Sequence, residues 1–325
     1  MRPPGLIIVG AISVLGAAAA VTASSSRGAQ PQAPASFKVA FFNIRSGHGQ
    51  PALRGRARPF TSTRNCTDTT KPMNAWGTGL VQQHLLESVG KEPVIALGLA
   101  ESWASVCGSP EHVRKVLGWA ARTSERNGVA MVARYGFAGP EQWEQLDTTL
   151  NTNPKDTMWV LHVPVCLDRG CSANIDMFVT HWFGTGENKN TSYDRQAQAT
   201  VAFLTKTAGG RPHVLVGDLN VWEGTKAVCG QQPNDTGLAR LRAAGYADAW
   251  QVVHGDAEGY TGMTNRRNCG SPEGYVWKRP DYVWAPAALR PRSIERFATV
   301  PPGEAAPSDH YGLIAEFPLP GRSTR

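Results

Sequence analysis

Residues 214–221 read Val-Leu-Val-Gly-Asp-Leu-Asn-Val, an apolar run that passes directly into polar residues. The segment 212–216 has the length and β-branched content of a buried strand, which places Asp218 and Asn220 at the carboxyl end of that strand. Glycine, aspartate and asparagine also favour turns, so this motif taken alone has an ordinary structural explanation.

The same pattern, an apolar strand followed by polar residues, recurs along the chain. Strands and helices alternate without an internal repeat or a second linker, which favours one α/β domain of stacked β-sheets with helices outside. A doubly wound nucleotide-binding fold is the rival, but neither of its glycine-rich phosphate motifs is present. The other predicted strands are 37–42, 93–99, 129–133, 158–165, 175–180, 282–285 and 311–317, and the predicted helices lie around 80–89, 113–118, 193–205 and 237–244.

The composition is that of a globular protein with a sizeable core. Hydrophobic residues make up 41% of the 325 residues and charged residues 18%, which excludes a disordered or coiled-coil chain. Lysine and arginine number 33 against 26 aspartates and glutamates, so the formal net charge is +7. Such an excess suits a polyanionic partner, either nucleic acid or an anionic lipid surface.

The amino-terminal residues predict export. A basic start at Arg2 is followed by an apolar run over 6–21 and then by small residues, which is typical of a secretory signal peptide cleaved after Ala23. The alternative is an uncleaved membrane anchor, although the run is short for a full span. Residues 24–36 are rich in Ser, Ala, Gln and Pro and predict a flexible linker, followed by one domain over 37–320 and a tail over 321–325.

The cysteines agree with an exported protein. An even number of cysteines in a secreted chain favours disulfide bonds, and no spacing suggests structural zinc. A local bridge from Cys166 to Cys171 is plausible because a tight turn separates them. Pairing the others by proximity in the chain is a guess among 15 possible connectivities. The six cysteines are Cys66, Cys107, Cys166, Cys171, Cys229 and Cys269.

Polar side chains that bind metal ions or carry protons follow several of the predicted strands. Taken singly, each is explained as a turn residue, a solvated carboxylate or a partly buried histidine. Taken together, they predict one cleft at a sheet rim, where oxygen donors would suit Mg²⁺ or Mn²⁺ and histidines would suit proton transfer. These residues are Asn43, Glu101, His181, Asp218, Asn220, Asp281, Asp309 and His310.

The ordered series of motifs resembles the endonuclease/exonuclease/phosphatase superfamily, which includes pancreatic-type deoxyribonucleases, exonuclease III-like repair enzymes and bacterial sphingomyelinases. The combination of GDLN, a later DY strand and a terminal SDH is the most specific part. The matching segments are FFNIRS at 41–46, LAESW at 99–103, NGVAMVAR at 127–134, FVTHW at 178–182, VLVGDLNV at 214–221, YADAW at 246–250, RPDYVWA at 279–285 and SDHYGLIAEF at 308–317.

The resemblance implies a four-layer α-β-β-α sandwich with two packed mixed sheets. It also implies an enzyme that hydrolyses phosphate esters with a divalent metal ion, Mg²⁺ or Mn²⁺. Glu101 would ligate the metal, with Asn43 and Asp309 assisting. The segment around Glu101 departs from the family, because it reads A-E-S-W rather than Q-E.

The resemblance also implies the catalytic roles. Asp218 would align or deprotonate the attacking water, and Asn220 would hold that water or a phosphate oxygen. His310, oriented by Asp281, would transfer a proton at the phosphate, and His181 would stabilise the phosphoryl oxygens. Since no nucleophilic serine motif is present and no cysteine lies among these segments, direct attack by water is the expected mechanism.

Three further residues are predicted to bind substrate. Arg134 and Tyr135 stand near the NGVAMVAR segment and would contact phosphate, unless they form an ordinary strand end. Trp182, like Trp103 and Trp222, lies next to a catalytic motif and would either stack on a base or sugar or pack at the edge of the core.

The expected substrate is nucleic acid bound by a secreted monomer. Basic residues between Arg45 and Lys71, at Arg266-Arg267 and at Lys278-Arg279 would follow a phosphate backbone, unless they only form a solvated face. One alternative is a sphingomyelinase-like phosphodiesterase acting on lipid headgroups, for which 250–260 is a candidate membrane-docking segment. A binding module without catalysis is the other.

Overall fold

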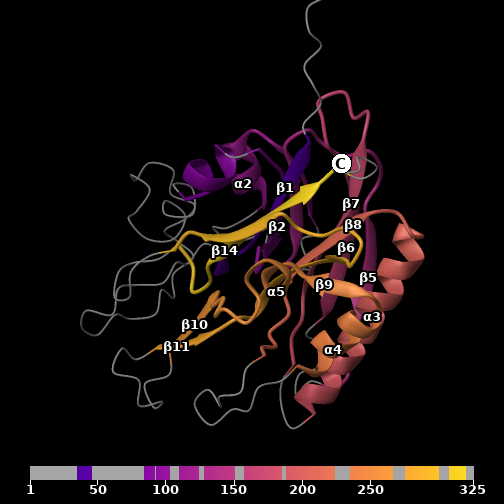
Figure 1. Cartoon of the computed structure of the whole chain (residues 1–325), viewed down its shortest axis with the longest axis vertical. Helices are drawn as coiled ribbons and strands as arrows, with labels where there is room; N and C mark the ends of the chain where they lie inside the picture. Colours follow the sequence, from indigo (N-terminus) through magenta and orange to yellow (C-terminus); the bar gives the residue numbers. More distant parts are fainter. Residues whose placement is uncertain are drawn as a thin grey trace, which may run out of the picture. The chain divides into compact units, whose positions relative to one another are not determined.

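Two six-stranded mixed β-sheets stack face to face in the computed structural model of the chain (Figure 1). The structure describes residues 35–45, 84–91, 93–102, 110–123, 128–150, 157–184, 188–223, 235–265, 275–299 and 307–319. Trp103, most of the basic loop, Arg266-Arg267 and four of the six cysteines lie outside the described residues, as do the predicted signal peptide and tail.

The first sheet has the order β13-β14-β1-β2-β4-β3, and β1 and β2 are its one parallel pair. A parallel pair at the centre brings two carboxyl ends to the same edge. Its strands are β1 (Ser36–Asn43), β2 (Val94–Ala100), β3 (Ala120–Thr123), β4 (Ala130–Ala133), β13 (Ser293–Phe297) and β14 (Gly312–Pro318).

The second sheet repeats this design with the order β5-β6-β7-β8-β12-β9, and β7 and β8 are the parallel pair. A separate two-stranded sheet is formed by β10 (Gly262–Asn265) and β11 (Tyr275–Lys278). The strands of the second sheet are β5 (Gln142–Leu146), β6 (Met158–Cys166), β7 (Asn174–His181), β8 (His213–Asp218), β9 (Tyr246–Asp248) and β12 (Asp281–Pro286).

Helices cover the outer faces and complete four layers. The π-helical turn η3 (Leu85–Gly90) and α2 (Pro110–Leu117) share a core with the outer face of the first sheet. The helices α3 (Lys189–Ala208) and α4 (Thr236–Ala243) do the same for the second sheet (Figure 1). The short α5 (Ala249–His254) packs into the core between the sheets. The predicted α-β-β-α sandwich is therefore confirmed.

The central strands read as continuous apolar runs because both of their faces are buried. In β7, Met177 and Val179 face the core between the sheets, whereas Phe178 faces the core under α3. Strands of this kind lack the alternation of a half-solvated strand. All of the predicted strands and helices that fall on described residues are present, and β1 begins at Ser36, one residue before the predicted domain start.

The strands that the sequence did not predict are the four edge strands of the two large sheets and the two strands of the separate hairpin, β10 and β11. The outermost strands of the two sheets are β3, β5, β9 and β13. An edge strand has a neighbour on one side only and is short or carries charged residues, as in the Ser-Ile-Glu-Arg-Phe of β13. Such segments lack the continuous apolar run that predicts the central strands from the sequence.

The candidate membrane-docking segment is not an exposed apolar hairpin. Trp250 is buried in the core between the sheets, and its Nε1 donates to the carbonyl oxygen of Ala257 at 2.9 Å. Trp250 is therefore not available at the surface for membrane docking. None of the described helices has the length and apolar character needed to cross a bilayer.

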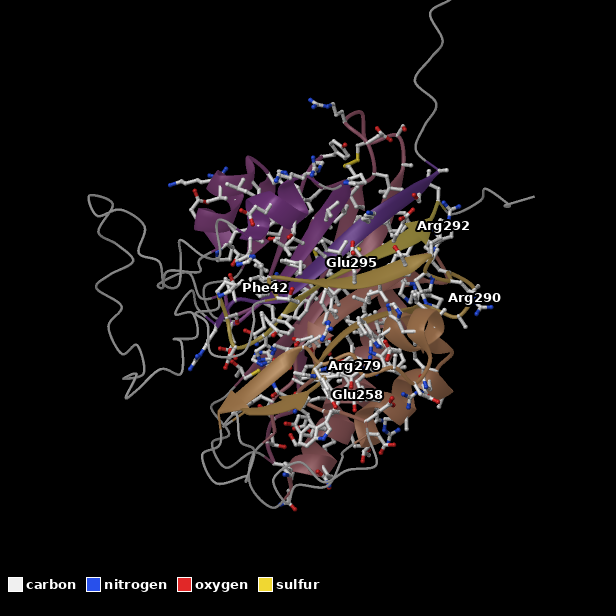
Figure 2. All side chains as sticks on the ribbon, turned by 60° about the vertical axis from the view of Figure 1, so that its left-hand side comes forward. Phe42, Glu258, Arg279, Arg290, Arg292 and Glu295 are labelled. Carbon is white, nitrogen blue, oxygen red and sulfur yellow. A yellow bond between two sulfur atoms is a disulfide. The ribbon has the colours of Figure 1, made fainter. Side chains whose placement is uncertain are left out.

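The predicted local disulfide is present. Cys166 at the end of β6 bonds to Cys171, visible as the yellow bond in Figure 2. Asp168 holds the turn between them, because its Oδ1 accepts from the backbone N–H of Gly170 at 2.8 Å and its Oδ2 from the hydroxyl of Ser172 at 2.6 Å. The local pairing is therefore confirmed, and the other pairings stay predictions.

The close approach of the two sheets gives a test of the packing. A Cβ atom on Gly98 of β2 would lie 2.5 Å from Cγ2 of Val216 and 3.1 Å from Cγ2 of Val179. We therefore expect Gly98→Ala to lower the free energy of unfolding by ~1–3 kcal/mol in urea titrations, as for other overpacked cores. Gly90→Ala, whose Cβ would make only ordinary contacts, is the control; equal stability of the two variants would contradict this packing.

Candidate active site

Six strands bring polar side chains to one shared edge. The strands β1, β2, β7 and β8 end there, and β12 and β14 begin there because they run antiparallel to their neighbours. Asp281, the first residue of β12, lies opposite Asp218, the last residue of β8. This edge collects the predicted residues Asn43, Glu101, His181, Asp218, Asn220, Asp281, Asp309 and His310.

The backbone bends sharply directly after three of these strands. Arg45, Glu101 and Asn220 have φ values of 44°, 47° and 53°, in the left-handed region that non-glycine residues rarely adopt. Each such residue costs of order 1–3 kcal/mol, and residues of this kind cluster at functional sites. Here the bends lie at strand ends, beside the side chains that form the site.

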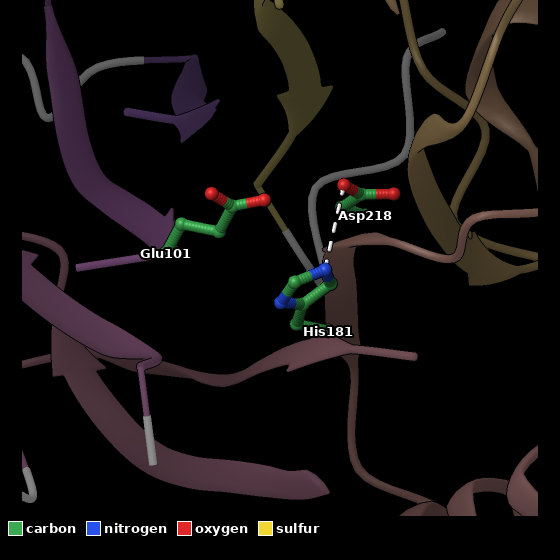
Figure 3. A group of neighbouring side chains, drawn as sticks. All are labelled: Glu101, His181 and Asp218. Atoms are coloured by element: carbon green, nitrogen blue, oxygen red, sulfur yellow. Dashed lines mark ion pairs between the residues drawn. The ribbon is translucent and has the colours of Figure 1, made fainter. Parts of the chain in front are cut away.

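Three hydrogen-bond acceptors converge at the centre of the edge. Figure 3 shows the carboxylate of Glu101 and the ring of His181 directed toward Asp218. His181 Nε2 lies 3.6 Å from Asp218 Oδ2, and one ligand atom from each of the three residues lies within 4.8 Å of the others. Two carboxylates and an imidazole at this spacing fit a divalent cation.

Asn43 holds the two carboxylates together. Its buried amide donates from Nδ2 to Asp218 Oδ2 at 2.9 Å and to Glu101 Oε1 at 3.2 Å. Its Oδ1 accepts from the backbone N–H of Arg45 at 3.0 Å. In this orientation Asn43 donates to both carboxylates and positions them, and its role as a metal ligand stays a prediction.

Asn220 fixes the orientation of His181. Its Nδ2 donates to the carbonyl oxygen of Trp182 at 2.8 Å and lies 3.0 Å from His181 Nε2. Since Nδ2 must be the donor toward the carbonyl, His181 Nε2 is the acceptor and its proton is assigned to Nδ1. The Nδ2 of Asn220 is thus engaged within the protein, and the role of Asn220 in holding water or a phosphate oxygen stays a prediction. The same amide also supplies the orienting partner for His181 that the sequence lacked.

The second part of the site is a buried aspartate–histidine pair. His310 Nδ1 lies 2.8 Å from Asp281 Oδ2, and its Nε2 faces Asp218 Oδ2 at 3.8 Å. Burial alone would lower the pKa of His310, but the charges of Asp281 and Asp218 outweigh it and raise this pKa to about 10. Burial raises the pKa of Asp281, and His310 offsets this only in part. His310 is therefore protonated at neutral pH.

The Ser308–His310 segment is anchored to the end of β1. The buried Ser308 hydroxyl donates to the carbonyl oxygen of Asn43 at 2.6 Å and accepts from the backbone N–H of His310 at 3.2 Å. Asp309 lies at the rim, where its Oδ2 is 3.6 Å from Arg45 Nε. Among the described residues, Asp309 belongs to neither group of His, Asp and Glu side chains that lie close enough to share one metal ion, and its assisting role stays a prediction.

Of the three predicted substrate contacts, Arg134 and Tyr135 lie away from this edge, whereas Trp182 adjoins it with its side chain buried. The backbone N–H of Arg134 bonds to Ile95 at the start of β2, about 20 Å from Glu101 by strand rise. Arg134 Nε donates to the carbonyl oxygen of Val94 at 2.7 Å, and the adjoining Tyr135 packs against the core. Trp182 is fully buried, with Nε1 donating to Thr200 Oγ1 at 3.1 Å. These contacts favour the structural alternative for each side chain, and contact with the substrate stays a prediction.

Solved structures share this architecture. The chain superposes on an endonuclease/exonuclease/phosphatase protein of Beutenbergia cavernae with a TM-score of 0.61 and 18% identity, over 90% of this chain and 74% of that one. A Bacteroides vulgatus protein of the same description gives 0.58 and 15%, over 87% and 99%. The chain has the endonuclease/exonuclease/phosphatase fold. D. rerio TDP2 complexed with a single-strand DNA product gives 0.55 and 12%, over 87% and 99%.

The similarity to these proteins is one of fold rather than of sequence. No protein-family model matches the chain, and no curated protein matches it either. At identities of 12–18%, the comparison establishes the fold. The chemistry of the site follows from the arrangement of this chain's own side chains.

One residue of the site lay outside the reach of sequence reasoning. Thr261 is fully buried, and its Oγ1 accepts from the backbone N–H of Asp281 at 3.3 Å. Its carbonyl oxygen accepts from the backbone N–H of Tyr311 at 2.6 Å, so Thr261 ties together the segments that carry Asp281 and His310. It stands in a segment without strand or helix periodicity, and no local signal marks it.

The raised pKa of His310 predicts a pH-dependent stability in the absence of metal ions. The folded chain binds this proton more tightly than the unfolded chain, whose histidine has a pKa of 6.5. The stabilisation is therefore complete below 6.5 and is lost as the pH rises toward about 10. Urea unfolding in EDTA should show this decline, and His310→Asn should abolish it.

His84→Asn is the control for this measurement. Burial lowers the pKa of His84, so any contribution of this residue falls at acidic pH. The variant should retain the decline at alkaline pH. A wild-type stability that stays level between neutral pH and the pKa of His310 would contradict the assignment of a protonated His310.

Proposed function

We propose that this chain is a metal-dependent phosphodiesterase of the endonuclease/exonuclease/phosphatase superfamily that hydrolyses nucleic acid. The observation that carries the proposal is the meeting of two groups at one sheet edge. The first is the acceptor cluster of Glu101, His181 and Asp218, and the second is the protonated Asp281–His310 pair. A phosphodiester is an anion, and its hydrolysis requires both charge neutralisation and a proton donor.

The proposed mechanism assigns a task to each group. Glu101 and His181 would hold a divalent ion, Mg²⁺ or Mn²⁺, which supplies Lewis acidity at the phosphoryl oxygens. Asp218 orients the attacking water and accepts its proton. His310, kept protonated by Asp281, donates from Nε2 to the leaving oxygen. The water oxygen forms the new bond to phosphorus as the ester bond breaks, so protons and charges balance.

Nucleic acid is favoured over the zwitterionic headgroup of sphingomyelin by two observations. The chain carries a formal net charge of +7, which suits a polyanionic substrate. TDP2, which shares the fold, has been solved with a single-strand DNA product. In contrast, Trp250 of the candidate membrane-docking segment 250–260 is buried in the core. A sphingomyelinase-like activity therefore has no described surface to support it.

The catalytic assignment predicts the behaviour of two variants. Asp218→Asn and His310→Gln should lower kcat by roughly 10²–10⁴, because each removes one proton-transfer group. Turnover would be measured on plasmid DNA, RNA, sphingomyelin vesicles and bis(p-nitrophenyl) phosphate, with Mg²⁺, with Mn²⁺ and with EDTA. Activity on nucleic acid that EDTA abolishes is the expected result.

Arg195→Gln provides the matched control. Arg195 lies on α3 and pairs with Asp147 at the surface, so its loss should leave kcat unchanged. Hydrolysis of no substrate in the panel, or activity of Asp218→Asn equal to that of the wild type, would refute the proposed chemistry. Cleavage of sphingomyelin without cleavage of nucleic acid would retain the chemistry and overturn the substrate.

We also propose that the protein is secreted after removal of residues 1–23. The apolar run near the amino terminus and the Cys166–Cys171 bond support export, because disulfides persist in oxidising compartments. Expression of the full chain in a bacterial host should yield an extracytoplasmic protein whose first residue is Ser24. A product that stays in the cytoplasm with its amino terminus intact would contradict this proposal.

A further inference from the structure

The β10–β11 hairpin continues the active-site edge beyond His310. Gly262 of β10 forms an antiparallel bridge to His310 and pairs with Lys278 of β11 on its other side. Lys278 is therefore two strand spacings, about 10 Å, from His310. Figure 1 shows this hairpin as a separate unit beside the sheets.

The side chains of His310 and Lys278 lie on the same face of the arrangement in which Gly262 pairs with both residues. Residues paired directly across antiparallel strands carry their side chains on one face. A Cβ atom on Gly262 would lie 3.7 Å from Cε1 of the His310 ring, which places the His310 side chain on the Cβ side of Gly262. Lys278, paired with the same glycine, shares that side.

The two adjoining cations, Lys278 and Arg279, have different surroundings. Arg279, labelled in Figure 2, is largely buried and neutralised by Asp248 Oδ2 at 2.5 Å and Glu223 Oε2 at 3.7 Å. Within the described part of the chain, no carboxylate lies at ion-pair distance from Lys278. The charge of Lys278 is thus not compensated by any described acidic residue.

Trp222 lies against the ammonium group of Lys278. Lys278 Nζ is 5.1 Å from the centre of the Trp222 ring, and Trp222 is 8% exposed. Trp222 follows Asn220 by two residues, so the aromatic support is anchored to the loop that orients His181. A cation stacked on a buried ring loses less conformational entropy when it binds an anion than a freely rotating lysine does.

We propose that Lys278, supported by Trp222, binds a second phosphate group of the substrate, next to the phosphate that is cleaved. This subsite would make the protein select a polyanionic strand over an ester with a single phosphate. The inference rests on the proposed function, since it takes His310 as the marker of the cleaved phosphate. A single-stranded nucleic acid supplies such a neighbouring phosphate, whereas sphingomyelin does not.

The test separates strand binding from chemistry. Lys278→Gln should raise KM for a short single-stranded DNA about tenfold and lower the slope of log Kd against log salt by about 0.7, the value for one phosphate contact on a single strand. Affinity would be measured in EDTA by fluorescence anisotropy of a labelled strand. The values of kcat and KM for bis(p-nitrophenyl) phosphate should not change.

Two further variants serve as controls. Lys206→Gln removes the same charge from an exposed position on α3 and should leave the salt slope unchanged, which excludes an effect of net charge alone. Lys278→Arg keeps the cation and should restore most of the affinity. Both variants keep the proposed catalytic residues.

Several outcomes would overturn the subsite. If Lys278→Gln lowered kcat/KM equally for the DNA strand and for bis(p-nitrophenyl) phosphate, Lys278 would maintain the structure of the active site instead of binding a neighbouring phosphate. Unchanged affinity and salt slope in Lys278→Gln would exclude a phosphate contact, as would a wild-type protein that hydrolyses the small ester or sphingomyelin but binds no strand. Failure of the wild type to hydrolyse any phosphodiester would instead refute the proposed function.

Discussion

The structure depends on burying like charges where six strand ends meet. Asp218 and Asp281 are almost completely buried, and the carboxylate of Glu101 approaches the first of them. Unpaired charges in such a place cost several kcal/mol each. The chain offsets this cost with the amide of Asn43, the backbone N–H of Asn220 and the protonated ring of His310. These compensations leave acceptors that still face one another, which is the arrangement expected of a cation site.

At the opposite end of β7 and β8, a buried carboxylate is instead paired through both of its oxygens. Asp176, at the start of β7, is as buried as Asp218, but it accepts from His162 at 2.8 Å and from Arg211 at 2.8 Å. Burial alone would raise the pKa of Asp176, but these two partners lower it overall. A buried carboxylate with both oxygens held by hydrogen bonds from side chains supports the fold. The difference between the two ends of β7 and β8 is therefore one of partners, not of residue type.

Most of the site was predictable because its residues follow apolar strands. Runs buried on both faces are visible in the sequence, and so are the polar residues that end them, such as Asp218 after β8. The same rule fails where function depends on a neighbour from another segment. Thr261 has no local signal. Lys278 and Arg279 carry the same charge, and only the structure shows that acidic side chains pair with Arg279 whereas no described acidic side chain pairs with Lys278. Trp182 adjoins His181 in sequence, yet its side chain lies in the outer core.

By itself, the sequence determined the α/β class, the central strands and which polar residues stand at their ends, because burial and side-chain chemistry are local properties. Only the tertiary structure decided which ends share an edge and which acceptors face one another. It also decided the orientation of the amides of Asn43 and Asn220, which donate to protein atoms. Edge strands and the direction of each amide depend on partners that are distant in sequence, and no periodicity along the chain records them.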